Sequence, residues 1–310
     1  MQRKRRIEES IVAITKDSQE EESIQRALEL LPIHDIIQAG DRVVITPNWV
    51  KAQPAYTGTV VGPQTLQTLI RYIKTKNPSE IYIATGSGGD PTSKVMEVVG
   101  YNKIIEEEQV KFVDLNYGPY VEIQLEHDKP ERTKINELLI NTDVLISFTQ
   151  LKQHEEATVS GGIKNIALGW PPAEIHGFPK KSLGIHEDLH GFIVAMAKKI
   201  PIDITIVSAD KTMIGTGPSD GKAVDTPSLI LAGTDPVATD TIGARLLGFL
   251  PQAVQYIYQL YIQGYGVAEP EKMDLRGIPL AEAERIFSMA AYQQEIILDK
   301  NGIKNIHGNQ

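Results

Sequence analysis

The sequence alternates between short runs rich in valine and isoleucine and longer amphipathic stretches, and this alternation covers most of the chain. It is typical of consecutive βα units, in which parallel strands form a sheet and the intervening helices cover its faces. The expected strands are residues 10–15, 42–45, 80–84, 111–113, 143–148, 202–207 and 228–232. We therefore predict an α/β fold with a mainly parallel, Rossmann-like sheet and helices on both faces.

Two of the intervening helices can be placed from the sequence. Residues 64–76 bring their leucines and isoleucines onto one helical face. Asp235 is expected to cap the amino end of a second helix, with Pro236 at its first position.

No internal repeat, low-complexity tract or Gly/Ser/Pro linker divides the sequence. We therefore expect residues 1–270 to form one α/β domain. Residues 271–310 are expected to form a short helical C-terminal appendage, because residues 280–291 have helical character.

Charge and composition exclude several classes of protein. The net charge of −9 argues against a general nucleic-acid-binding protein, because phosphate backbones require an excess of Lys and Arg. No apolar run approaches the roughly 18 residues of a membrane span. No apolar region typical of a secretory signal follows the basic residues 1–10, so we expect a solvated tail and a cytoplasmic protein. The absence of cysteine excludes disulfides, thiolate nucleophiles and Cys-ligated iron–sulfur clusters.

The segment after the fifth expected strand carries the strongest candidate site. Lys152, His154 and Lys164 lie close together in this segment, and the pair Gly161-Gly162 would let the backbone approach a ligand closely. Ligands of open α/β sheets bind beyond the carboxyl ends of the strands, where we expect these side chains to lie. A single histidine or lysine in a loop is usually structural or solvated, so it is their combination that favours a functional loop.

A glycine-rich segment, residues 85–91, follows the third expected strand, where a phosphate-binding loop would lie. Pro91 stands where a dinucleotide-binding motif needs its third glycine, and no Gly-Lys-Ser/Thr sequence ends the run as in a P-loop. A flexible substrate loop and a plain strand-to-helix turn are both consistent with this segment.

Residues 186–190, His-Glu-Asp-Leu-His, match the zinc-protease pattern of two histidines one helical turn apart. Glycines flank the motif and no third-ligand motif follows, so chance resemblance is the simpler interpretation. His186 and His190 are therefore weak candidates for metal ligands, whereas His186 alone is a candidate acid–base group. Asp210, near the end of the sixth expected strand, is the candidate partner to orient it, with helix capping as the alternative.

An ordered set of short motifs resembles the family called domain of unknown function 362, over about residues 10 to 250. The set comprises Thr46-Pro47-Asn48, Leu151-Lys152-Gln153-His154, Ser160-Gly161-Gly162-Ile163-Lys164-Asn165, His186, Asp210 with Gly217-Pro218, and residues 232–240. That family is mostly uncharacterised and usually has Lys-Pro-Asn where this chain has Thr-Pro-Asn. Some of its members carry ferredoxin-like cysteine clusters, which this chain lacks.

A more distant resemblance is to the N-terminal domain of nickel-dependent lactate racemases. The loop with His154, Gly161-Gly162 and Lys164 is similar to a loop in which, in that family, the histidine performs acid–base chemistry and the lysine holds the cofactor. A Gly-Thr-His-Arg motif of that family corresponds to residues 85–88 here, which contain no histidine. The resemblance therefore does not imply a two-histidine racemase mechanism, and it does not establish a nickel-pincer cofactor.

These features predict an enzyme that acts on a small anionic metabolite of the carboxylate type, which the basic loop would bind. The expected reaction is racemase/isomerase-like or lyase-like acid–base chemistry. A histidine with its ordinary pKa of about 6.5 can serve as acid or base at neutral pH. The candidate catalytic residues are His154, Lys164, His186 and Asp210; the candidate substrate- or cofactor-binding residues are Asn48, Gly86, Ser87, Gly88, Lys152, Gly161, Gly162 and Asn165.

Two other functions stay open at this point: a non-catalytic accessory protein that binds an anion or cofactor, and a divalent-metal-dependent hydrolase. The sequence leaves the cofactor, a bound divalent metal and assembly into a homo-oligomer undetermined. It indicates neither a nucleic-acid partner nor a membrane partner.

Overall fold

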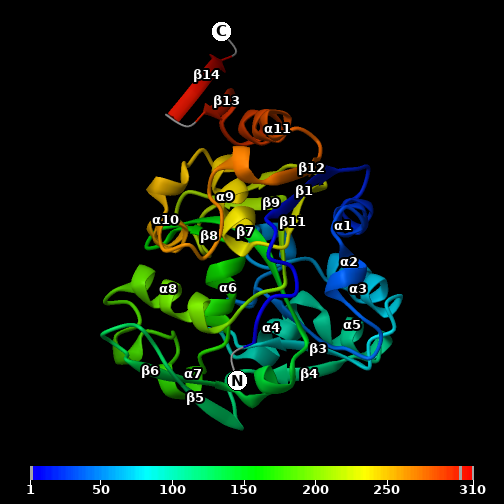
Figure 1. Cartoon of the computed structure of the whole chain (residues 1–310), viewed down its shortest axis with the longest axis vertical. Coiled ribbons are helices and arrows are strands. Elements are labelled where there is room, and N and C mark those ends of the chain that lie inside the picture. The colour runs from blue at the N-terminus through cyan, green and yellow to red at the C-terminus, as the bar shows by residue number, and fades with distance from the viewer. Residues whose placement is uncertain (1–2, 300–301, 309–310) are drawn as a thin grey trace.

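A computed structural model describes residues 3–299 and 302–308, and within these residues a ten-stranded sheet runs through the molecule (Figure 1). The order of its strands is β12-β1-β11-β9-β7-β2-β3-β4, with β8 paired to β7 and β10 paired to β9. Their bounds are β1 Ile11–Lys16, β2 Arg42–Pro47, β3 Glu80–Thr85, β4 Lys111–Asp114, β7 Val144–His154, β8 Thr158–Ser160, β9 Ile204–Ile214, β10 Lys222–Asp225, β11 Leu229–Gly233 and β12 Asp274–Gly277. Each of the seven strands expected from the sequence is present.

The sheet is mainly parallel, which confirms the predicted α/β fold. Strands β4, β3, β2, β7 and β9 are parallel neighbours, whereas β11 lies antiparallel between β9 and β1. In the centre, Ile45 of β2 pairs with Ile83 of β3 and Ile146 of β7. The middle of each of these strands is buried because helices cover both faces of a parallel sheet.

Two hydrophobic cores fill the space between the sheet and its two helical layers. Alternate residues of a strand enter different cores: Val44 contributes to one, and Val43 and Ile45 to the other. One core is covered by α1 Glu20–Glu29, α2 Ile33–Ile36, α3 Pro63–Lys74, α4 Thr92–Val99 and α5 Tyr101–Glu107. The other is covered by α6 Gly162–Gly169, α8 Leu189–Lys199, α9 Pro236–Leu246, α10 Gln255–Ile262 and α11 Leu280–Tyr292.

Both helices placed from the sequence are confirmed. Helix α3 begins at Pro63 and turns its leucines and isoleucines into the core. Helix α9 begins at Pro236, and the side chain of Asp235 accepts the backbone N–H groups of Val237 and Ala238, as an N-cap residue does.

The C-terminal part of the described chain combines a strand, a helix and a hairpin. Strand β12 pairs in parallel with β1, so it belongs to the main sheet. Helix α11 confirms the helical character predicted there and packs on α9. Beyond it, β13 Gln294–Asp299 and β14 Gly302–Gly308 form a hairpin that projects from one end of the molecule (Figure 1). The division of the chain at residue 270 stays a prediction.

A second hairpin, β5 Tyr120–Gln124 and β6 Arg132–Asn136, lies outside the main sheet. The short helix α7 Ala173–His176 lies in the segment between α6 and α8. Neither element was expected from the sequence, because hairpins with polar, half-exposed strands give little hydrophobic pattern.

The basic opening segment is not a solvated tail in its described part, contrary to the expectation. Arg3 forms an ion pair with Asp203, just before β9. Arg6 donates to Asp41, just before β2, with Nη2 and Oδ1 2.8 Å apart. The segment therefore crosses the amino-terminal edge of the sheet, where two acidic residues hold its arginines.

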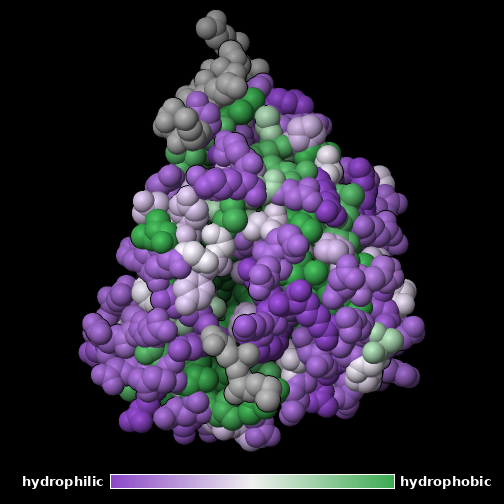
Figure 2. Space-filling model, viewed as in Figure 1, coloured by the Kyte–Doolittle hydropathy of each residue, from purple (hydrophilic) through white to green (hydrophobic). Residues whose placement is uncertain are grey.

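The surface visible in Figure 2 is mostly hydrophilic, with apolar residues in small groups. Tyr258 and Ile262 of α10 are among the large apolar side chains that are exposed. In the part of the chain that the structure describes, no helix has both the length and the apolar character needed to cross a membrane.

Candidate functional site

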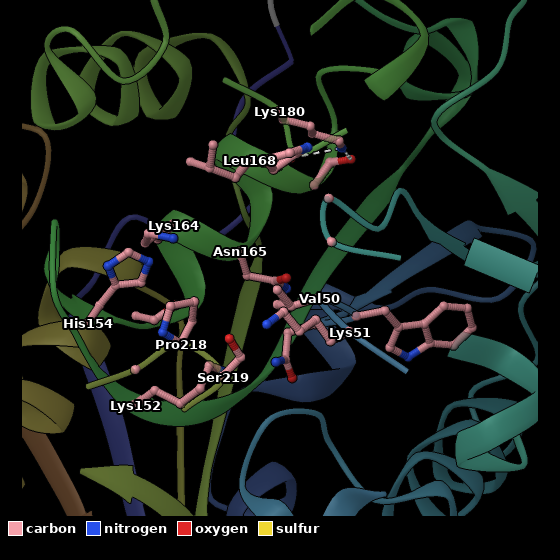
Figure 3. Close-up of a pocket in the computed structure, with 18 of the residues that line it drawn as sticks. Val50, Lys51, Lys152, His154, Lys164, Asn165, Leu168, Lys180, Pro218 and Ser219 are labelled. Atoms are coloured by element: carbon pink, nitrogen blue, oxygen red, sulfur yellow. Dashed lines mark hydrogen bonds between the residues drawn. The ribbon is translucent and has the colours of Figure 1, made fainter. Parts of the chain in front are cut away.

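A cavity of about 390 Å³ lies at the carboxyl ends of β2, β3 and β7 (Figure 3). Its walls come from residues 48–51 after β2, 86–89 after β3, 152–156 at the end of β7, 164–169 of α6, and the loops 179–186 and 217–219. Parallel strands bring all these segments to one edge of the sheet, which is the usual place for a ligand in an α/β protein. The structure therefore brings together the two segments that carried the candidate residues, after β3 and after β7.

The cavity is electropositive although the protein carries a net charge of −9. Its charged lining residues are Lys51, Lys152, Lys164, Lys180, Lys181, Glu155 and Glu156. Five lysines thus face two glutamates. Such a cavity attracts anions, because the low-dielectric walls strengthen the field of the charges that line it.

Lys152 is a buried amine at the end of β7. Its Nζ donates to the carbonyl oxygens of Thr59 and Gln150, at 3.2 and 3.1 Å. Burial, together with the charge of Lys164, lowers the pKa of Lys152 to about 7. The amine therefore changes its charge near neutral pH.

Lys164 lies on α6 and is half-buried in the cavity wall. Among the described residues, no side chain or carbonyl accepts a hydrogen bond from its Nζ. Burial lowers the pKa of Lys164 to about 8, so it is mostly charged at neutral pH. Lys164 is thus a cation of the cavity wall with donors available for a ligand.

His154 lies beside Lys164 in the same wall (Figure 3). Its Nδ1 accepts the backbone N–H groups of Glu156 and Ala157, at 3.1 and 3.2 Å. The ring proton is therefore on Nε2. Burial and the neighbouring lysines lower the pKa of His154 to about 2, which differs from the expectation of a group titrating near 6.5. His154 is consequently a neutral hydrogen-bond donor.

His186 contacts a carboxylate that the sequence did not suggest. Its Nδ1 is hydrogen-bonded to Oε2 of Glu156, and Oε1 of Glu156 accepts from Lys181 at 3.1 Å. Asp210 does not line the cavity: its Oδ1 accepts the backbone N–H of Ser228 at 2.7 Å. The prediction that Asp210 orients His186 is therefore wrong, and Glu156 has that place.

The glycine pair 161–162 contacts Asp240 of α9, which the sequence reading left out of the site. Oδ1 and Oδ2 of Asp240 accept the N–H groups of Gly162 and Ile163, at 2.7 and 3.0 Å. A Cβ on Gly161 would lie 2.4 Å from Oδ1 of Asp240. The absence of side chains on the two glycines thus leaves room for the buried carboxylate of Asp240 at the start of α6. Neither glycine lines the cavity.

Only some residues of the glycine-rich segment after β3 line the cavity. Gly86 and Gly88 line the cavity, whereas Oγ of Ser87 donates to the carbonyl of Val50 at 2.8 Å. The buried Nζ of Lys180 donates to the carbonyls of Gly86 at 2.8 Å and of Leu168 at 3.0 Å (Figure 3). Lys180, which the sequence reading missed, thereby ties this segment to the end of α6.

Two asparagines line the cavity and also hold its frame. Asn48 donates to the carbonyl of Thr59 at 2.8 Å and accepts the N–H of Gln150 at 3.0 Å. Asn165 donates from Nδ2 to the carbonyl of Thr46 at 2.8 Å. Asn48 therefore joins the loop after β2 to β7, and Asn165 joins α6 to β2.

The zinc-protease pattern does not form a metal site. His190 uses both ring nitrogens on the backbone: Nδ1 accepts the N–H of Tyr256, and Nε2 lies 3.2 Å from the carbonyl of Glu156. Helix α8 begins at Leu189, so His186 lies outside it. Among residues 3–299, whose side chains the structure describes, no group of three or more His, Cys, Asp or Glu is placed to hold a metal ion.

The comparison with protein families matches residues 43–245 to a family described as a domain of unknown function, DUF362. The chain belongs to the DUF362 family. The match contains the cavity segments from β2 to α8, so the electropositive cavity lies within the DUF362 domain.

Two individual proteins are also similar to this DUF362 chain. The thylakoid-associated protein sll1697 of Synechocystis sp. is 21% identical over 221 residues, which are 71% of this chain and 67% of that protein. The lactate racemase apoprotein of Thermoanaerobacterium thermosaccharolyticum superposes with a TM-score of 0.46 and 19% identity. That match covers 78% of this chain and 58% of the racemase, so the chain spans less than two thirds of the racemase.

Proposed function

We propose that this protein is an enzyme that binds a small carboxylate in the electropositive cavity and acts on it by acid–base chemistry. The observation that carries the proposal is the half-buried ammonium of Lys164, which has no acceptor among the described residues. A charge held in a cavity without a hydrogen-bond acceptor is costly, and an anionic ligand would reduce that cost.

The neighbouring groups complete a carboxylate site. Lys152 adds a second amine, and Nε2–H of the neutral His154 adds a donor beside Lys164. Donors fixed at one place stabilise negative charge that develops on a substrate, without reorganisation during the reaction. His186 beside Glu156 supplies a second imidazole for proton transfer.

Proton exchange tests this proposal directly. The protein is incubated in D₂O with a panel of carboxylates that carry a C–H next to the carboxylate, and loss of that C–H is followed by proton NMR. We expect exchange for at least one compound. His154→Ala should slow the exchange about a hundredfold or more, since it removes a donor to the developing negative charge, and should weaken binding less than Lys164→Met does. Lys164→Met should weaken binding about tenfold or more, since a hydrogen bond to a charged group contributes about 1.5–3 kcal/mol.

The same panel of carboxylates also distinguishes an enzyme from a non-catalytic accessory protein. Binding of a carboxylate without any exchange would contradict the enzymatic part and favour a non-catalytic anion-binding protein. If no carboxylate binds to the wild-type protein, the whole proposal is wrong.

A further inference from the structure

Glu156 contacts three histidines, of which His154 and His186 line the cavity. Its backbone N–H donates to Nδ1 of His154, and its carbonyl oxygen lies 3.2 Å from Nε2 of His190. Its carboxylate contacts Nδ1 of His186 through Oε2 and Nζ of Lys181 through Oε1. One residue thus contacts all three imidazoles.

The carboxylate of Glu156 is ionised. Burial alone would raise the pKa of Glu156, but hydrogen bonds from Lys181 and His186 outweigh burial and lower it. An ionised carboxylate only accepts hydrogen bonds, so Nδ1 of His186 carries a proton.

The other nitrogen of His186 is then free to accept a proton. His186 lines the cavity, and no described residue forms a hydrogen bond with its Nε2. In the neutral ring, a lone pair on Nε2 is therefore available to a ligand. His154 has the opposite arrangement, with its lone pair on Nδ1 bound to the backbone and its proton on Nε2.

We propose that Glu156 is a positioning residue that holds His186 as the proton acceptor of the cavity, while His154 is its neutral N–H donor. This inference rests on the function proposed above. In the forward step, a C–H bond of the carboxylate breaks and an N–H bond forms at Nε2 of His186. The electron pair stays on the substrate as an enolate, whose oxygen accepts from His154 and Lys164. Return of the proton from His186 restores the C–H bond, so no further reactant is required.

The tautomers can be measured without a ligand, by ¹⁵N NMR of histidine-labelled protein, with signals assigned through His186→Gln and His154→Gln. We expect the neutral ring of His186 to carry its proton on Nδ1 and that of His154 on Nε2. Glu156→Gln should remove the preference of His186 for the Nδ1–H form. Glu187→Gln is the matched control, because Glu187 is a neighbouring exposed glutamate paired with Lys129.

Chemical modification gives a second measurement that a purely structural role for Glu156 would not change. Diethyl pyrocarbonate attacks unprotonated imidazole nitrogens, and peptide mass spectrometry reports the rate at each histidine. We expect His186 to react about tenfold faster than His154, and Glu156→Gln to lower the rate at His186 several-fold, since a hydrogen bond to a charged group favours one form by this order. Thermal unfolding of both glutamine variants shows whether they are folded.

Two results would overturn the inference: a wild-type His186 ring protonated on Nε2, or a folded Glu156→Gln protein with an unchanged tautomer and rate. The wild-type spectrum decides the first point even if Glu156→Gln does not fold. Carboxylate binding with the wrong tautomer would refute this inference alone. The expected tautomers without any carboxylate binding would refute the proposed function alone.

Discussion

The carboxylate of Asp240 accepts the backbone N–H of Gly162 at 2.7 Å, although the two residues are 78 positions apart in the chain. Its second oxygen accepts the N–H of Ile163 at 3.0 Å. The first N–H groups of a helix have no partner within the helix, so Asp240 satisfies two of them at the start of α6. Because α6 carries Lys164, this contact positions the main cation of the cavity.

Asp240→Asn should destabilise the protein by about 1–3 kcal/mol, because one buried N–H would then face an amide NH₂ and lose its acceptor. Denaturant unfolding measures the change. Burial raises the pKa of Asp240 to about 7, so its contribution to stability is full below the unfolded-state pKa of about 3.8 and is lost as the pH rises through about 7. The destabilisation should therefore be larger near about pH 5 than near about pH 8. An equal loss at both values would contradict this assignment.

Gly162→Ala should also destabilise the protein, because its Cβ would lie 2.2 Å from Cγ2 of Thr205, a buried side chain of β9. Overpacking of this kind costs about 1–3 kcal/mol. Gly88→Ala is the matched control, since its Cβ would meet only the Lys180 side chain, at 3.6 Å. The melting temperatures of the two variants test this prediction, and that of Gly162→Ala should be the lower. Equal melting temperatures would show that the contact between Gly162 and β9 is not tight.

Lys152→Met should bind carboxylates more weakly and yet be at least as stable as the wild type. Removal of the amine leaves no orphan carbonyl, because Thr59 still accepts from Asn48 and Gln150 still accepts from Thr149. The pKa of Lys152 is lowered to about 7 from its ordinary 10.5, so the folded state disfavours the charge at lower pH. The free energy of unfolding of the wild-type protein therefore rises, through Lys152, between about pH 7 and about pH 10.5.

The increase in the free energy of unfolding that Lys152→Met produces should accordingly be largest below about pH 7. It should disappear near about pH 10.5. Urea unfolding across this range is the measurement. A variant that is less stable than the wild type at every pH would show that the amine is structural.

The main sheet was largely predictable because each of the seven expected strands carries its own hydrophobic signal. Strands β2 and β7 are buried on both faces and each begins or continues with an apolar run, residues 43–45 and 144–146, and Asp235 marks the start of α9. The path of the N-terminal segment was not predictable, since the ion pair between Arg3 and Asp203 joins residues 200 positions apart. A local pattern contains no information about such a partner.

Only part of the candidate site was predictable. Lys152 and His154 follow a recognisable parallel strand, so the edge of the sheet where they lie could be inferred. Glu156, Lys180 and Asp240 were missed because each acts on a segment distant in sequence, and a glutamate in a turn or an aspartate in a helix carries no signal of its own. The contact of Glu156 with His186 spans 30 positions and appears only once the loops meet in space.

The most direct test of the account is the affinity of the wild-type protein for carboxylates as a function of pH, measured by isothermal titration calorimetry. Acetate, succinate and citrate are compared with their uncharged amides at about pH 6 and about pH 9.5. At least one carboxylate should bind at the lower pH and the amides should not. Its affinity should fall by at least about tenfold at the higher pH, because Lys152 and Lys164 lose their charges above pKa values of about 7 and about 8. Equal affinity at both pH values, or equal binding of the amides, would contradict the claim that the lysines of this cavity bind an anion.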